Sequence, residues 1–93
     1  MKNMNCIVSG EILDLYRTDK VCKIKVLTLD RTAIIPFSVF PTSRKGDPNP
    51  LYDRLKQYKA GDYIFCHVYA YVDKANEIGL YLKNVEPCKV ANK

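Results

Sequence analysis

Aromatic and imidazole side chains occupy every second position between residues 63 and 71 of this chain. They are Tyr63, Phe65, His67, Tyr69 and Tyr71. Small or branched apolar residues fill the intervening positions, so the segment predicts a strand with one buried face and one aromatic face. The buried face suits the interior of a small β-barrel, which does not need an aromatic ladder for its own packing. Flat rings on a small basic domain favour either a platform for stacking nucleic-acid bases or a surface that pairs with another subunit.

The chain carries a moderate excess of positive charge. Fifteen Lys and Arg residues against ten Asp and Glu residues give a net charge of +5 and a pI near 9.1. Such an excess is compatible with binding a polyanion, but many small basic domains bind no nucleic acid, so charge alone leaves the partner open. No apolar run reaches the roughly 20 residues that span a bilayer, and the N-terminus shows no signal-peptide pattern. We therefore expect an intracellular, cytoplasmic protein without a membrane partner.

Cysteine and histidine are too scattered to predict a metal site. The four cysteines, at positions 6, 22, 66 and 88, form no Cys-x-x-Cys pair, and the only histidine, His67, faces away from Cys66 on an alternating strand. We expect reduced thiols, with Cys22 and Cys66 acting as small core hydrophobes, and neither a metal nor another cofactor. The sequence also contains no paired carboxylates, nucleophile with a base, or phosphate-binding glycine loop, which argues against an enzyme.

The apolar pattern predicts five strands. They cover residues 5–17, 21–29, 33–40, 62–73 and 78–86. Gly10 predicts a bulge or sharp bend in the first strand, which would let one strand serve two sides of a small barrel. Pro36 cannot donate to a ladder, so the third strand is expected at a sheet edge or at a bulge.

A loop and a short helix separate the third strand from the fourth. Residues 41–50 hold three prolines and a glycine, which predicts a loop. Asn49 before Pro50 predicts a capped helix start, and Gly61 is expected as the residue that ends the helix. Tyr52 fits either the surface or an interface. The positions that recur at helical spacing and are expected in the core are Leu51, Leu55 and Tyr58.

Three strands, one helix and two further strands is the element order of an all-β OB-fold, a five-stranded Greek-key barrel. An SH3-like barrel lacks the helix. A ferredoxin-like sandwich needs a helix between the first two strands, where residues 18–20 leave room only for a turn. One domain is expected over residues 1–93, with its core in 5–86 and a short frayed tail from 87 to 93.

Three segments carry a resemblance to a known family. They are Val-Ser-Gly-Glu-Ile at 8–12, Ile-Pro-Phe-Ser-Val-Phe at 35–40 and Lys-Ala-Gly-Asp-Tyr-Ile-Phe-Cys-His-Val at 59–68. With them, the chain from Val8 to Val85 resembles the single-stranded DNA-binding protein family, in its small phage, plasmid and mobile-element forms, and the related primosomal OB proteins. Because the Lys-x-Gly-Asp turn is shared by many OB-folds, the match is specific for the fold and suggestive for the ligand.

The resemblance assigns roles to several residues. It implies that Phe40 faces outward to stack a base while Val39 packs inside, with Ile35 and Phe37 inside by the same parity. It also implies that Tyr71 and Lys74 open a DNA-wrapping loop. The residues that it places near subunit contacts are Tyr63 and Phe65. The chain has no tryptophan, so any stacking must use Tyr and Phe.

OB-folds bind nucleic acid on the outer face of the second and third strands and on the flanking loops. The candidate nucleic-acid-binding residues are Tyr16, Lys20, Lys23, Lys25, Arg31, Phe40, Arg44, Lys45, Tyr69, Tyr71, Lys74, Tyr81 and Lys83. The candidate subunit or partner interface comprises Tyr63, Phe65 and His67. Alternatively, the lysines form a solvated strand face, Phe40 caps the barrel beside the helix, and Tyr69 and Tyr71 serve either surface.

The leading hypothesis is a non-catalytic, sequence-tolerant protein that binds single-stranded DNA in replication or recombination, as a homodimer or higher oligomer. The alternative is an OB-fold accessory subunit that docks on a replicative polymerase, primase or helicase and binds DNA weakly by itself. An RNA-binding OB module is disfavoured because the second and third strands lack the aromatic RNA-binding signatures.

Overall fold

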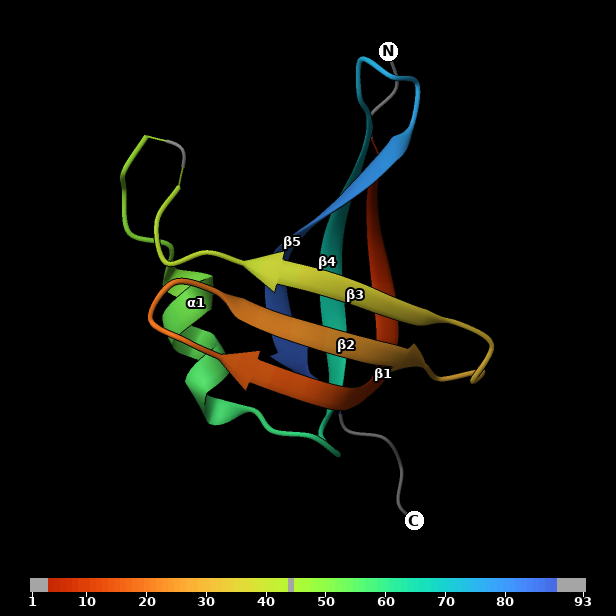
Figure 1. The fold of residues 1–93 in the computed structure, drawn as a ribbon. Coiled ribbons are helices and arrows are strands. Elements are labelled where there is room, and N and C mark those ends of the chain that lie inside the picture. Colours follow the sequence, from red (N-terminus) through yellow and green to blue (C-terminus); the bar gives the residue numbers. More distant parts are fainter. Residues whose placement is uncertain (1–3, 44, 89–93) are drawn as a thin grey trace.

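The computed structural model describes residues 4–43 and 45–88 (Figure 1). Its five strands are β1 (Met4–Arg17), β2 (Cys22–Thr28), β3 (Ile34–Val39), β4 (Tyr63–Val72) and β5 (Ile78–Pro87). Each predicted strand boundary is confirmed to within one residue. The last strand includes Pro87, so the predicted tail begins later than expected, and its residues 89–93 lie outside the described residues.

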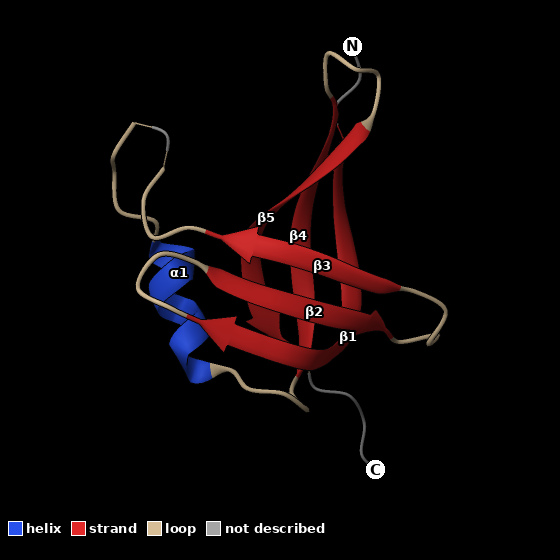
Figure 2. Ribbon diagram, viewed as in Figure 1, coloured by secondary structure: helices blue, strands red, loops and turns tan. Residues whose placement is uncertain are grey.

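The strands form one antiparallel sheet in the order β3-β2-β1-β4-β5. The sheet curls into a half-barrel, with β3 and β5 as its two edges and the short helix at one end (Figure 2). The edge position of β3 agrees with the prediction from Pro36, whose missing N–H is tolerated there. The all-β architecture with one short helix is thus confirmed.

The long strand β1 causes the curl because it pairs with two partners in succession. Residues 4–11 pair with β4 and residues 10–17 with β2, so the two pairings overlap at Gly10 and Glu11. A Cβ atom at Gly10 would lie 2.3 Å from the Leu27 carbonyl oxygen, so only glycine allows the strands to approach this closely.

The sequence predicted a bulge or a sharp bend at Gly10, but the register of β1 with β2 is unbroken at that residue. The register breaks instead between Ile12 and Asp14, which leaves Leu13 as the extra residue. Ile12 is held by the turn before β4, since its N–H donates to the Asp62 carbonyl and its own carbonyl accepts from the Gly61 N–H, each over 2.8 Å. These tertiary hydrogen bonds locate the bulge, and they have no signal in the local sequence.

The core lies inside the curl, where the inward positions of the strands meet α1 (Pro50–Arg54) and the 3₁₀ turn η1 (Leu55–Gln57). The predicted alternation of β4 is confirmed, since Ile64, Cys66 and Val68 are at most 1% exposed. Cys22 is likewise fully buried, and all four cysteines are free thiols. The parity of β3 is also confirmed: the buried residues there are Phe37 and Val39, Ile35 is half-buried against the core, and Phe40 is exposed.

The helix begins where the sequence predicts, but it ends earlier. The Asn49 Oδ1 atom accepts from the Leu51 N–H over 3.1 Å, which caps the first turn. Helical geometry stops at Tyr58, which is extended, so Gly61 does not end the helix as predicted. Gly61 instead takes a φ of 100° in the Lys59–Asp62 turn that leads into β4. Within 4–43 and 45–88, no helix is long and apolar enough to cross a membrane.

Tyr52, which the sequence left between surface and interface, belongs to the core at 7% exposure. Its hydroxyl donates to the Thr18 carbonyl oxygen, and Arg17 donates to the Tyr52 carbonyl oxygen. The Arg17 guanidinium also lies 3.9 Å from the centroid of the Tyr52 ring, a cation–π distance. These contacts fasten α1 to the turn between β1 and β2. Of the predicted helix core, Leu51 and Leu55 are buried and Tyr58 packs half-buried against them.

Candidate functional site

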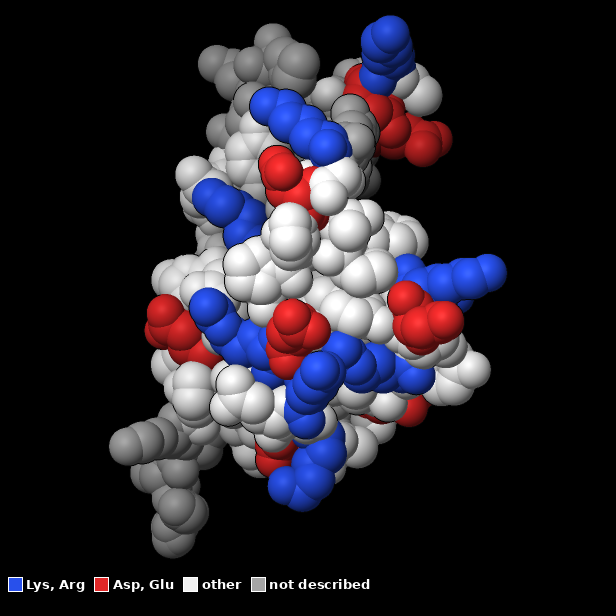
Figure 3. Space-filling model, turned by 90° about the vertical axis from the view of Figure 1, so that its left-hand side faces the viewer, with Lys and Arg blue, Asp and Glu red and all other residues white. Residues whose placement is uncertain are grey.

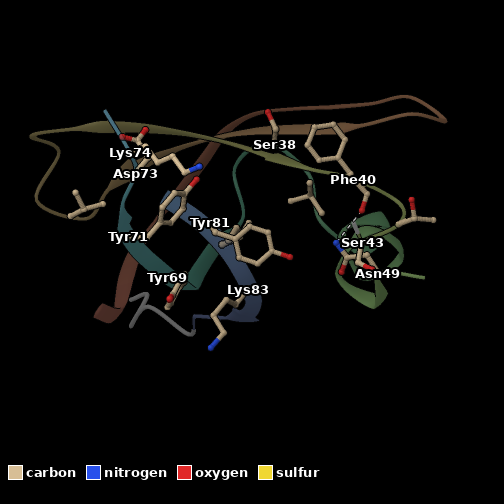
Figure 4. A pocket seen from close by; sticks show the side chains of 14 residues that line it. Ser38, Phe40, Ser43, Asn49, Tyr69, Tyr71, Asp73, Lys74, Tyr81 and Lys83 are labelled. Carbon is tan, nitrogen blue, oxygen red and sulfur yellow. Dashed lines mark hydrogen bonds between the residues drawn. The ribbon is translucent and has the colours of Figure 1, made fainter. Parts of the chain in front are cut away.

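A groove of about 1500 Å³ lies between the end of β3, the loop that follows it and the β4–β5 hairpin (Figure 4). Its walls come from segments that are up to 45 residues apart in sequence, since Ser38 and Lys83 both line it. The groove is lined by Ser38, Val39, Phe40, Thr42, Ser43, Asn49, Tyr69, Tyr71, Val72, Asp73, Lys74, Tyr81, Leu82 and Lys83.

Four aromatic rings line this groove, and all four are candidates from the sequence. Phe40 and Tyr81 are 55% and 51% exposed, Tyr71 is 37% exposed and Tyr69 is half-buried. Tyr69 and Tyr71 lie side by side, with their ring centroids 6.1 Å apart and 26° between their planes. Tyr81 faces Tyr69 across the β4–β5 ladder. Phe40 approaches from the other wall, at the end of β3 (Figure 4).

The residue that caps the helix also holds the backbone at Phe40, on the β3 side of the groove. Asn49 caps α1 with its side-chain oxygen and donates from its Nδ2 atom to the Phe40 carbonyl oxygen over 3.0 Å. One side chain therefore ties the start of the helix to the end of β3. The expectation that Phe40 faces outward, away from the core that contains Val39, agrees with this placement.

Two lysines, Lys74 and Lys83, supply positive charge to the groove. Lys83 lies 3.4 Å from the side-chain oxygen of Asn5. The nearby Asp73 carboxylate is occupied by the hairpin turn, where it accepts from the Ala75 and Glu77 N–H groups over 2.9 and 3.0 Å. On the side of the molecule that carries α1, Lys and Arg side chains surround a largely uncharged area, with acidic side chains among them (Figure 3).

Gly79, which is not among the residues predicted from the sequence, lies opposite Tyr71 in the β4–β5 ladder. A Cβ atom at Gly79 would lie 2.4 Å from the Tyr71 Cζ atom, so the ring covers the glycine backbone. The signal in the sequence is a glycine inside a predicted strand, which often marks a close approach. Its partner depends on the hairpin register and could not be read from the chain.

A second candidate surface continues from the groove onto the outer face of β2. Lys23 lies between Tyr16 and Ser38 in the ladders, and Lys25 lies one row further along β2. Both lysines and Tyr16 are exposed, and Ser38 also lines the groove. The structure therefore places Tyr16, Lys23 and Lys25 on one face that leads to Phe40. Lys20 is exposed in the turn that joins β1 to β2.

Of the remaining candidates in the loops, neither Lys45 nor Arg31 lines the groove. Lys45 is exposed in the loop after β3, and Arg44 lies outside the described residues. Arg31 precedes β3 whereas Phe40 follows it, so the two lie at opposite ends of this strand. The Arg31 guanidinium is 3.7 Å from the Glu11 carboxylate, which is within 3.5 Å of the Tyr63 hydroxyl. Arg31 thus belongs to the far margin of the β2–β3 face.

The three predicted interface residues share the outer face of β4. Tyr63 and Phe65 are 37% and 36% exposed. Ile7 of β1, which was not predicted from the sequence, is 61% exposed on the same face. Ile7 pairs with His67 in the β1–β4 ladder. His67 is half-buried, with its Nε2 atom 3.4 Å from the Glu86 carboxylate but not aligned for a hydrogen bond. Tyr69 and Tyr71 continue this outer face of β4 into the groove, whereas Tyr63, Phe65 and His67 do not line the groove.

Comparisons with protein-family models, curated proteins and solved structures gave no match to this chain. The groove and the two faces described above are therefore the basis for inferring a function.

Proposed function

We propose that this chain is an OB-fold protein that binds single-stranded DNA without catalysis and with little sequence preference. The strand order β3-β2-β1-β4-β5, with a helix between β3 and β4, supports this fold. In a five-stranded Greek-key barrel, the outer strands approach each other to close the cylinder, and β3 contacts β5 here. This function is also the one that the resemblance to the single-stranded DNA-binding family implies.

The aromatic groove is the observation that carries the proposal. The groove is lined by four aromatic rings, and none of them belongs to the buried core. They are Phe40, Tyr69, Tyr71 and Tyr81. An unpaired strand exposes flat base faces, and each base that stacks on a ring contributes about 1–3 kcal/mol. A duplex hides those faces, so rings in a groove favour single strands. Every base has a π-face, which accounts for the proposed tolerance of sequence.

The lysines would hold the phosphates of the bound strand. Lys74 and Lys83 line the groove itself, and Lys23 and Lys25 lie on the adjoining face. Each phosphate that a lysine neutralises releases counterions, so affinity must fall as salt rises. If only Lys74 and Lys83 make such contacts, raising the salt from 50 to 200 mM weakens binding by about sevenfold.

The decisive experiment is a titration of labelled oligo-dT at these two salt concentrations. We expect sub-micromolar binding that weakens at least to this extent. Tyr81→Ala should reduce affinity by about 5- to 150-fold, which corresponds to the loss of one stacked base. Tyr63→Ala removes a tyrosine of the same strand pair that lies outside the groove, and it should bind like the wild type. Equal losses in both variants would contradict the assignment of the groove.

The accessory-subunit function is the second candidate, and the exposed outer face of Ile7, Tyr63 and Phe65 favours it. Such a subunit would bind oligo-dT weakly by itself and would regain affinity with a replicative polymerase, primase or helicase. In that case Phe65→Ala should abolish the recovery, whereas Tyr81→Ala should leave it intact.

A further inference from the structure

Gly79 faces Tyr71 in the β4–β5 ladder, two residues after the hairpin turn has ended. The turn itself relies on Asn76, which takes a φ of 63°. The φ of Gly79 lies outside the left-handed region, so its backbone conformation does not require glycine. A glycine inside a strand is otherwise unfavourable because it costs conformational entropy and offers no side chain for packing. Its presence here therefore needs a local reason.

The Tyr71 ring supplies that reason. A Cβ atom on Gly79 would lie 2.4 Å from Cζ, 2.6 Å from the hydroxyl oxygen and 2.7 Å from Cε2 of Tyr71. These distances are far inside the roughly 3.5–4.0 Å at which carbon atoms pack. The ring thus occupies the space that any other residue at position 79 would fill.

The contact with Gly79 also sets the orientation of the Tyr71 ring in the groove. Part of the ring is covered by the glycine backbone, while 37% of the residue remains exposed. The neighbouring Tyr69 ring lies at 26° to it, so the two rings form a nearly parallel pair along β4. A ring held in one orientation before binding loses less side-chain entropy when a base stacks on it.

We propose that Gly79 is a positioning residue for the groove, which sets the Tyr71 ring in the orientation that stacks a nucleic-acid base. This inference rests on the proposed function. Gly79 acts through Tyr71 and has no side chain with which to contact the strand. A methyl group at position 79 would push the ring away from β5 and separate it from Tyr69.

A double-mutant cycle tests the proposal by titration of labelled oligo-dT. Gly79→Ala should weaken binding by nearly as much as Tyr71→Ala, within the 5- to 150-fold range for one stacked base. In the Tyr71→Ala background, Gly79→Ala should change affinity by less than about twofold, because residues that act together are not additive. Independent, multiplying losses would overturn the proposal. Leu80→Ala is the matched control in β5 and should bind like the wild type.

A second measurement needs no DNA. The Gly79 Hα protons should show an upfield ring-current shift in the NMR spectrum of the wild type, and Tyr71→Ala should abolish it. An ordinary Gly79 Hα shift in the wild type would overturn the proposal, even if Gly79→Ala did not fold. A wild type that fails to bind oligo-dT would instead overturn the proposed function. Wild-type binding that Gly79→Ala leaves unchanged would overturn only the role of Gly79.

Discussion

Among the core residues, Cys66 shows the largest effect of burial on acidity. Cys66 is fully enclosed on the inward face of β4, and burial raises the pKa of its thiol from 9.0 to about 12. Burial also raises the pKa of the Cys22 thiol, partly opposed by the nearby Arg17 charge. The thiolate is the reactive form of cysteine, so both residues are inert packing elements at neutral pH.

The raised pKa of Cys66 predicts a loss of stability at high pH. Below pH 9 the thiol is protonated in both the folded and the unfolded chain. Between pH 9 and about 12 the unfolded chain releases the proton while the folded chain retains it. The free energy of unfolding should therefore fall by up to about 1.4 kcal/mol per pH unit in this window.

Urea denaturation between pH 8 and 11 measures this effect, with Cys66→Ala as the comparison. The difference between the two proteins isolates the contribution of Cys66. The variant should lose stability less steeply than the wild type. Identical slopes would show that Cys66 does not carry the effect.

At the scale of elements, the short helix depends on contacts with the β1–β2 turn. With only five residues, α1 is too short to be stable alone. Arg17 stacks on the Tyr52 ring and donates to the Tyr52 carbonyl oxygen, while the Tyr52 hydroxyl reaches Thr18. The ion pair of Arg17 with Asp53, at 3.7 Å, contributes little because the Asp53 carboxylate is largely exposed.

Arg17→Ala should therefore reduce the free energy of unfolding by about 1–3 kcal/mol, the sum of one cation–π contact and one hydrogen bond. Arg31→Ala is the control, since this arginine is exposed and makes one ion pair with Glu11. The free energy of unfolding of Arg31→Ala should stay within about 0.5 kcal/mol of the wild-type value in the same denaturant titration. A similar small effect for Arg17→Ala would mean that the helix is held by its apolar residues alone.

At the scale of the whole molecule, the outer face that carries Ile7, Tyr63 and Phe65 is a second surface beside the groove. These side chains are partly or largely exposed and lie on adjacent strands. Exposed apolar side chains gathered on one face commonly mark an interaction surface. We propose that two or more copies of the chain pair through this face, which leaves the groove free for DNA.

Size-exclusion chromatography with light scattering should then give a multiple of the chain mass of 10.7 kDa. Phe65→Glu places a charge in the proposed interface and should reduce the mass to that of one chain. Phe40→Glu places the same charge in the groove and should leave the mass unchanged. The pairing face would be wrong if the wild type were a single chain or if Phe65→Glu kept the wild-type mass.

The strands were predictable because their signal is local. Ile64, Cys66 and Val68 alternate with aromatic residues, and a period of two fixes both the strand and its buried face. The helix start was predictable for a similar reason, since Asn49 caps a turn that begins at Pro50. The bulge near Ile12 was not predictable, because it depends on backbone hydrogen bonds to the distant Gly61–Asp62 turn. The helix ends before the predicted Gly61, because the chain becomes extended at Tyr58.

The outward direction of the aromatic residues could be predicted from the sequence, but the groove that they line could not. Local periodicity determined that Phe40, Tyr69, Tyr71 and Tyr81 face away from the core. Only the curl of the sheet brings the end of β3 opposite the β4–β5 hairpin, and only the hairpin register sets Tyr71 on Gly79. Side-chain direction follows from one strand, whereas a cavity requires the relative position of several, which the packing of the whole chain decides.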